Sequence, residues 1–308
     1  MFLEKIPMRQ LIAWIFTAMV PVGIQLLSDS SWIWVACGGI ISMAVWMLLW
    51  RNGRERSKWE SAFLFIYIVF LLGELLRYTA QCWPMGNSDP AVPLVLLTLA
   101  AWSARRGPSV AARVGAVLFW AVLGLYLLVF AAGINEVKLE WLMPDQNSIN
   151  TAGLMVFLIP CSVLEISKEK KGTEKRMWLA PCMILAGVVI TAGVLSPSVA
   201  ARIPNAFYEM SRSLSFLDVA RRFEALICAA AAVGWFSLLS LLLTLCGRYT
   251  EKIFPTKGRG GIWIASLAAV TGRLCGLHIN PLYLVAVGTV FWVGLPLLTQ
   301  GLDKIKKS

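Results

Sequence analysis

The chain has 308 residues, of which 58% are hydrophobic and 15% are charged, and its mean hydropathy is +0.71. Soluble domains carry about 25% charged residues, so this composition excludes an ordinary soluble enzyme and favours a lipid environment. The net charge of +11 comes from short basic clusters between long apolar runs. That distribution is typical of loops that orient a membrane protein and not of a nucleic-acid groove.

Ten apolar segments are long enough to predict transmembrane helices. Three of them carry charged residues, at 61–80, 87–104 and 260–278. The other seven are free of charge, at 10–28, 30–50, 114–135, 146–164, 177–201, 225–247 and 279–302. The run 10–28 is too long for a signal-peptide core and is not followed by an A-x-A site, so we count it as a retained span. The predicted fold is therefore an all-α integral membrane protein with ten spans.

The basic residues predict the orientation of these spans. If the N-terminus is cytoplasmic, 21 of the 28 lysines and arginines lie in cytoplasmic segments and seven on the other side. This asymmetry is the one expected for cytoplasmic loops. An even number of spans then places both termini in the cytoplasm, and the chain divides into five-helix halves at 1–135 and 136–308.

One outer connection, 199–222, is longer than the rest and has an amphipathic pattern. Its apolar residues recur at helical spacing, at Ile203, Phe207, Met210, Leu214 and Leu217. The segment is either an interfacial helix that lies on the bilayer or an extracellular lid over a central cavity. The sequence does not decide between these two interpretations.

Charged residues inside membrane helices are costly and often functional. Glu74 and Arg77 are three residues apart, so they share a helix face; they form either a structural pair or a ligand or proton site. Glu224 starts the eighth span, where it either caps the helix or serves in gating. Arg273 lies near the outer end of the ninth span, where it either snorkels to the interface or has a functional role.

Helix-breaking residues lie within the first and sixth spans, which open the two halves. Interrupted helices at matching positions of two halves are typical of transporter binding sites, because unwound backbone leaves N–H and C=O groups free for a ligand. The alternative is two proline kinks that only shape packing. The candidate ligand contacts in these spans are Pro21, Val22, Gly23, Gly153, Pro160 and Ser162.

Other chemistry-bearing residues are few. Ser237 in the eighth span either lines a cavity or bonds back to its own helix. The seven cysteines form no C-x-x-C pair, and His278 is the one histidine. We therefore expect no cofactor, no metal site, no disulfide framework and no catalytic nucleophile–base set.

Several stretches, in order along the chain, resemble the B subunit of bacterial spore germination receptors, permeases of the amino acid–polyamine–organocation superfamily. They are Met8-Arg9-Gln10-Leu11, Ala101-Trp102-Ser103-Ala104-Arg105-Arg106-Gly107, Ala112-Arg113-Val114, Leu142-Met143-Pro144, Pro160 with the lysine-rich run from Lys168, and Arg222-Phe223-Glu224-Ala225-Leu226.

The resemblance implies two inverted five-helix repeats and an amino-acid-like germinant bound between helices 1, 3, 6 and 8. It also implies A and C receptor subunits as partners in the spore inner membrane. The chain is then a nutrient-sensing subunit, and the alternative is a secondary transporter of an amino acid or related cation. Members of the family often carry a lysine where this chain has Ser237 and Leu238, and the missing charge disfavours ion-coupled transport.

Overall fold

The computed structural model describes residues 6–51, 57–81, 91–142, 151–163, 166, 177–203, 205–214, 223–255 and 257–298. Within these ranges the regular structure is helical, with twelve α-helices and no β-sheet. The first six are α1 (Met8–Leu27), α2 (Trp32–Arg51), α3 (Lys58–Gln81), α4 (Ala91–Arg105), α5 (Pro108–Ile134) and α6 (Thr151–Val163). The others are α7 (Leu179–Leu195), α8 (Pro197–Ala200), α9 (Ala206–Ser213), α10 (Phe223–Ile253), α11 (Gly258–Leu274) and α12 (Pro281–Thr289).

Each of the ten predicted spans overlaps a described helix, and the span 177–201 includes both α7 and α8. Six segments are long and apolar enough to cross a membrane, namely α1, α2, α3, α5, α10 and the segment Pro281–Leu298 that begins with α12. The helices α4, α6 and α7 are apolar but shorter. These lengths and hydropathies indicate a multi-pass membrane protein.

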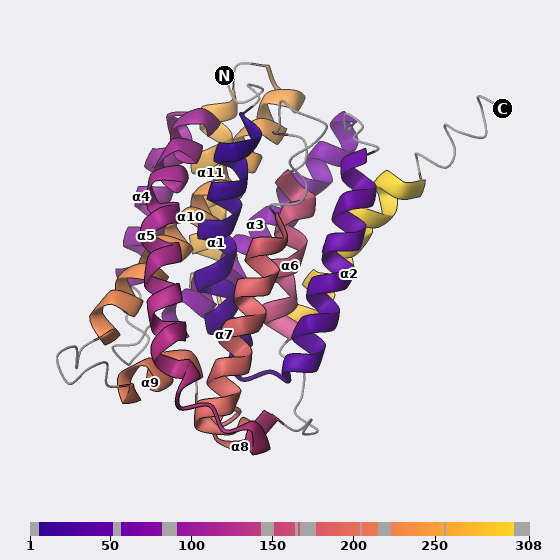
Figure 1. The fold of residues 1–308 in the computed structure, drawn as a ribbon. Helices are drawn as coiled ribbons and strands as arrows, with labels where there is room; N and C mark the ends of the chain where they lie inside the picture. The colour runs from indigo at the N-terminus through magenta and orange to yellow at the C-terminus, as the bar shows by residue number, and fades with distance from the viewer. Residues whose placement is uncertain are drawn as a thin grey trace.

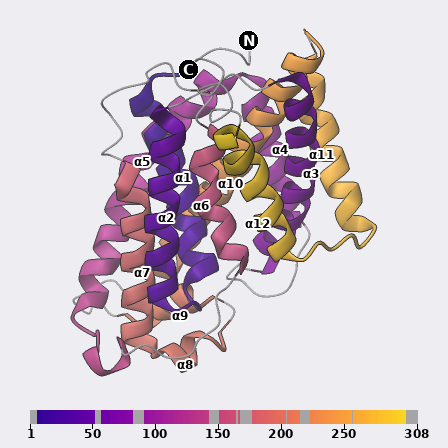
Figure 2. The same cartoon turned by 90° about the vertical axis from the view of Figure 1, so that its right-hand side faces the viewer.

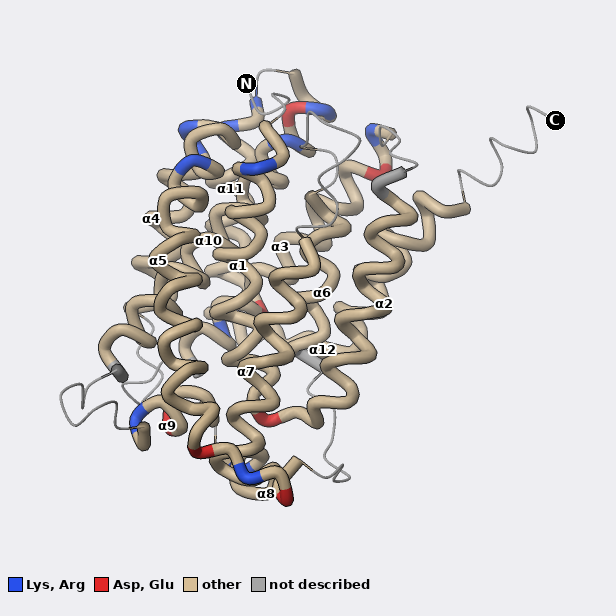
Figure 3. The backbone as a smooth tube through the Cα atoms, viewed as in Figure 1, with Lys and Arg blue, Asp and Glu red and all other residues tan. Residues whose placement is uncertain are grey.

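The outer surface of the bundle supports the same conclusion. Large apolar side chains point outward, including Val117 and Trp120 of α5, which are 76% and 73% exposed, and Ile41 of α2. Figure 3 shows the charged residues mainly toward the two ends of the bundle, with a broad uncharged region between them. An apolar surface this extensive is compatible with lipid and not with water.

The helix α1 is the core of the bundle. It packs against α5, α10, α7 and α6, and 94% of its most apolar 18-residue stretch is buried. Figure 1 shows it in the middle of the other helices, and the side view in Figure 2 shows α12 on the face of α3 and α6. An apolar helix that is buried all round is expected at the centre of such a bundle.

Glycines bring the neighbouring helices close to α1. A Cβ added at Gly115 of α5 would lie 2.8 Å from Trp14 Cδ1 and 2.9 Å from Trp14 Cα. A Cβ at Gly234 of α10 would lie 2.5 Å from Pro21 Cβ. Small residues at such contacts allow backbones in lipid to approach closely. Thr17 adds a polar contact, because its hydroxyl donates to the Gly115 carbonyl at 3.1 Å.

The amphipathic segment 199–222 differs from the predicted continuous stripe. The helix α7 ends at Leu195, where Ser196 adopts a φ of 63°, and the short α8 and a turn precede α9. Phe207 and Met210 of α9 are fully buried and Leu214 is nearly so, because α9 packs on α7, α10 and α1. The predicted apolar face exists, but it is interrupted near Ile203, and Leu217 lies outside the described residues.

The contact between α1 and α5 predicts opposite effects for two substitutions in one helix. Gly115→Ala places a methyl group against the Trp14 backbone, and overpacking of this kind costs about 1–3 kcal/mol. Gly124→Ala meets nothing within 4 Å and gains helix propensity of up to about 1 kcal/mol. We expect the thermal unfolding temperature of the purified protein to fall for Gly115→Ala and to hold or rise for Gly124→Ala. Equal temperatures for the two variants would contradict this packing.

Candidate functional site

The two predicted helix interruptions are not present as unwound backbone. The helix α1 continues through Pro21, Val22 and Gly23, and α6 continues through Pro160. The expectation of free backbone groups from unwinding is therefore wrong. Proline removes one helical hydrogen bond, and packing by neighbouring helices allows a membrane helix to continue past it.

The space around these residues is filled by side chains. A Cβ at Gly23 would lie 2.6 Å from Ile184 Cδ1 of α7 and 3.3 Å from Val156 Cγ1 of α6. A Cβ at Gly153 would overlap Leu27 of α1. Gly23 and Gly153 therefore act as close-packing positions between α1, α6 and α7, and Val22 is fully buried.

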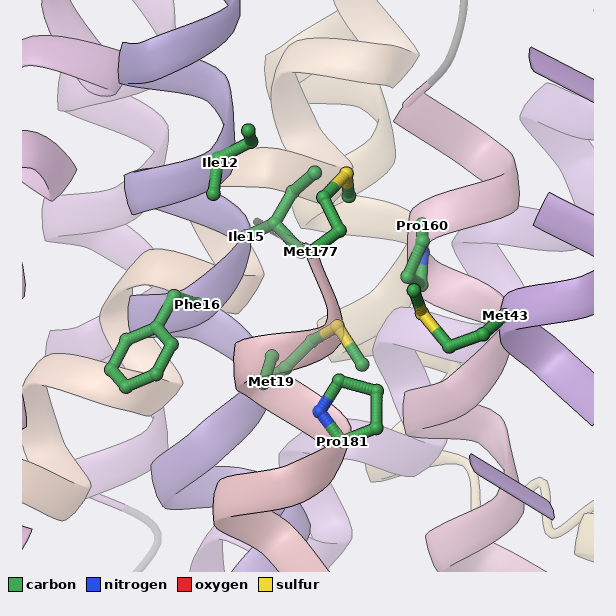
Figure 4. Close-up of a pocket in the computed structure, with 9 residues that line it drawn as sticks. Ile12, Ile15, Phe16, Met19, Met43, Pro160, Met177 and Pro181 are labelled. Carbon is green, nitrogen blue, oxygen red and sulfur yellow. The ribbon is translucent and has the colours of Figure 1, made fainter. Parts of the chain in front are cut away.

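Pro160 borders a small apolar cavity between α1, α2, α6 and the start of α7. Its volume is about 10 Å³, about enough for one water molecule. Figure 4 shows Met19, Met43 and Met177 around this space together with Pro160 and Pro181. No polar side chain is among the residues that line it, so the cavity is suited to an apolar group and not to an amino acid.

The predicted serines do not form a shared polar site. Ser162 donates its hydroxyl hydrogen to the carbonyl of Ile159 at 2.7 Å in its own helix. Ser237 is buried in α10, and its carbonyl accepts from the Ser240 hydroxyl at 3.0 Å. Hydrogen bonds of this kind satisfy hydroxyl groups within membrane helices.

A polar centre that the sequence did not reveal lies in the second half of α1. The indole nitrogen of Trp235 in α10 donates to Gln25 Oε1 at 2.8 Å. Gln25 is 4% exposed, and its Nε2 has no hydrogen-bond partner within the described part of the chain. A buried donor without a partner is costly, so a polar ligand or a water molecule at Gln25 Nε2 would be stabilising.

Tyr126 of α5 is a second buried polar residue, and it lies at a similar height along the bundle axis to Gln25. The helices α1 and α5 run in the same direction, since Trp32 after α1 donates its indole hydrogen to the carbonyl of Leu142 after α5. Measured from the Thr17–Gly115 contact, Gln25 lies about 12 Å along α1 and Tyr126 about 16 Å along α5. The Tyr126 hydroxyl is also buried without a partner among the described residues.

The helix α9 covers this centre from one end of the bundle. Its Phe207 stacks on Tyr126 with ring centroids 5.6 Å apart and meets Phe130 edge-on at 6.4 Å. Phe207 is fully buried. The aromatic contacts therefore hold α9 against α5, close to the end of α1 that carries Gln25.

Glu74 is the centre of a second polar group, and its predicted pairing with Arg77 is confirmed. Arg77 Nε lies 2.9 Å from Glu74 Oε2. Glu74 Oε1 accepts from the Ile279 amide at 2.9 Å and lies 3.0 Å from His278 Nδ1. Glu74 is 3% exposed, against 31% for Arg77 and 55% for His278. The carboxylate therefore attaches α3 to the segment between α11 and α12.

The other two charged candidates have different surroundings. Arg273 lines a cavity of about 50 Å³ together with Glu74, and its Nη1 is buried without a partner in the described structure. Arg273 as a whole is partly exposed, so its interpretation as a snorkelling or a functional residue stays a prediction. Glu224 belongs to the first turn of α10, but its side chain lies outside the described residues.

Metal ligation finds no support in the described part of the chain, where no three His, Cys, Asp or Glu side chains lie together. None of the six cysteines in the described ranges is joined in a disulfide. No family model matches the chain, and no curated protein matches it.

The Glu74 contacts predict a local effect of Glu74→Ala. The substitution removes the acceptor of the Ile279 amide, and a hydrogen bond to a charged group contributes about 1.5–3 kcal/mol. We expect hydrogen–deuterium exchange at Ile279 to rise by about 10-fold or more. Glu60→Ala is the control, because Glu60 accepts only from the Ser57 amide at the start of α3 among the bonds described. Unchanged exchange at Ile279 in Glu74→Ala would show that the carboxylate does not hold this segment.

Proposed function

We propose that this protein is a permease-like membrane receptor subunit that senses an amino-acid-type nutrient. The observation that carries the proposal is the Gln25 amide, a buried donor without a described partner on the most buried helix of the bundle. Buried unpaired donors are rare and call for a specific explanation. A carboxylate ligand would accept from Gln25 Nε2.

The helix contacts support an arrangement of two related five-helix units. The two units can be matched helix by helix: α1 with α6, α2 with α7, α3 with α10, α4 with α11, and α5 with α12. Many pairs of helices that are in contact then have a matching pair that is also in contact. The pair α1–α5 corresponds to α6–α12, α1–α7 to α6–α2, α4–α10 to α11–α3, and α5–α10 to α12–α3. The pairings α1–α10, α5–α7 and α4–α5 have no counterpart of similar extent in the described structure. The correspondence supports ten spans in two inverted repeats of the amino-acid-permease type.

The charges support a cytoplasmic location for both termini. The end of the bundle where α1 begins also carries Arg105, Arg106, Lys257 and Arg259. The connections at the other end carry Lys138, Arg202 and Arg212 together with Glu136, Glu140 and Glu209. A basic excess at one end is the pattern of a cytoplasmic face, and it supports an orientation in which α9 lies on the outer side of the membrane.

This arrangement suggests how ligand binding reaches partner subunits. Phe207 of α9 stacks on Tyr126 and α9 packs on α1, so we expect a ligand that enters from outside to displace α9. A ligand held at Gln25 acts on α1, and α1 contacts four other helices through close glycine packing. A shift of α1 would therefore change the whole bundle. The A and C receptor subunits implied by the family resemblance would detect that change in the spore inner membrane.

A secondary transporter of an amino acid or related cation is the alternative function. The pairing of two five-helix units favours it, because alternating-access transporters use this architecture. Fold alone does not separate a sensor from a transporter. Uptake separates them, since a sensor binds its ligand without moving it across the membrane.

The test is binding and uptake of a labelled amino-acid mixture by the purified protein in liposomes, with and without a proton gradient. We expect saturable binding without uptake. Gln25→Leu should weaken binding at least 10-fold, because it removes a buried hydrogen bond worth about 1.4 kcal/mol or more. Thr191→Val is the control, since the Thr191 hydroxyl bonds within α7 to Gly187.

The outcomes separate the alternatives. Saturable uptake would assign the protein to the transporters. Binding that survives Gln25→Leu unchanged would remove the Gln25 centre from the site. Absence of both binding and uptake, in protein that stays folded and monodisperse, would contradict an amino-acid ligand for the isolated subunit.

A further inference from the structure

A groove of about 720 Å³ opens on the side of the bundle between α5 and α7. Its floor is the first part of α1, including Ile12 and Ala13. The walls are largely aromatic and apolar, with Phe119 and Trp120 from α5 and Trp178 from α7. The groove therefore gives access from the lipid-facing surface to a helix that is otherwise buried.

The surroundings of the groove are those of a hydrocarbon-facing site. Trp120 is 73% exposed, and its neighbour Val117 is 76% exposed on the outer surface of α5. In a membrane these side chains contact acyl chains. A hollow that continues such a surface to the core helix is filled by hydrocarbon and not by an aqueous solute.

Two arginines lie at the end of the groove where α1 begins. Arg9 lines it from the first turn of α1. Arg113 of α5 is exposed and lies three residues before Ala116 and seven before Trp120, so all three share one helix face. This is also the basic end of the bundle. The mouth of the groove therefore combines positive charge with an apolar interior.

We propose that this groove binds one anionic phospholipid. Its phosphate pairs with Arg9 and Arg113, and one acyl chain lies along Phe119 and Trp120 against Ile12 and Ala13. A partner helix is a poor fit, because a membrane-spanning helix is about 10 Å wide and about 30 Å long, far larger than the 720 Å³ hollow. Basic clusters beside a hydrophobic surface are a recognised means of binding anionic lipid headgroups.

The bound chain would support α1 at a position where protein packing is incomplete. Ile12 lines the groove and also the small internal cavity beside Pro160 and Met177. A lipid chain against Ile12 therefore contacts α1 at the opposite end from Gln25. The lipid site is separate from the proposed nutrient site and does not depend on it.

Cys182 provides a native probe, because it lines the groove and is an exposed free thiol. The full-length protein in detergent is stripped of lipid and then given phosphatidylglycerol or phosphatidylcholine. N-ethylmaleimide modification is followed by peptide mass spectrometry at Cys182, with the exposed thiols Cys37 and Cys275 as internal references. We expect phosphatidylglycerol to slow modification of Cys182 at least 5-fold, and to leave Cys37 and Cys275 unchanged.

Native mass spectrometry of bound phosphatidylglycerol tests the residues. Arg9→Gln combined with Arg113→Gln should reduce the bound fraction at least 5-fold, whereas Arg105→Gln at the same basic end should not. Ala116→Trp fills the groove and should also reduce the bound fraction of phosphatidylglycerol. Val117→Trp is its control, because Val117 lies on the outer surface of α5.

Three results would overturn the proposal. They are equal protection of Cys182 by phosphatidylcholine, protection by inorganic phosphate alone, and retention of phosphatidylglycerol by the double arginine variant. The comparison of lipids on the unaltered protein decides the matter even if a variant fails to fold.

Discussion

The close approach of four helices to α1 is the constraint on which the rest of the structure depends. Lipid offers no hydrophobic driving force between apolar helices, so their association relies on van der Waals packing, and small residues make that packing close. Gly115 of α5, Gly153 of α6, Gly187 of α7 and Gly234 of α10 each face a side chain of α1 at a distance that leaves no room for a Cβ. The position of α1 therefore fixes the positions of its neighbours.

This packing also determines where a polar ligand has access to α1. The segment around Pro21 and Gly23 is filled by aliphatic side chains from α6 and α7, which leaves no space for a solute. Four residues beyond Pro21, Gln25 faces Trp235 and retains an unpaired amide nitrogen among the described residues. The same helix is thus fully packed through its middle and polar near one end. In the proposed function, a change at Gln25 would act on the four helices that pack against α1.

Apolar runs were sufficient to predict the long helices, three of them in spans that also carry charged residues, because a helix that crosses lipid needs a long apolar segment. The pairing of Glu74 with Arg77 was also predictable, since residues three apart share a helix face. Proline and glycine were misleading in α1 and α6. The same residues that interrupt an isolated helix are the ones that close packing in a membrane requires, and the sequence alone does not distinguish the two roles.

The remaining parts of the site depend on contacts distant in sequence. His278 was set aside as a single histidine, yet it lies 3.0 Å from the Glu74 carboxylate, 204 residues away. Gln25 and Trp235 are 210 residues apart, and no local pattern marks either of them. A glutamine near the end of an apolar span was the available signal, because a buried amide requires partners.

The most direct test of the central packing is a disulfide cross-link between α1 and α7. A Cβ at Gly187 would lie 2.9 Å from Ile24 Cγ1 and 3.2 Å from Ile24 Cγ2, within the range that cysteine pairs can bridge. In a variant without the seven native cysteines, Ile24→Cys with Gly187→Cys should cross-link rapidly on mild oxidation in membranes. Ile24→Cys with Ile41→Cys should not, since Ile41 points outward from α2. Absence of the first cross-link, or equal formation of both, would contradict a bundle built around α1.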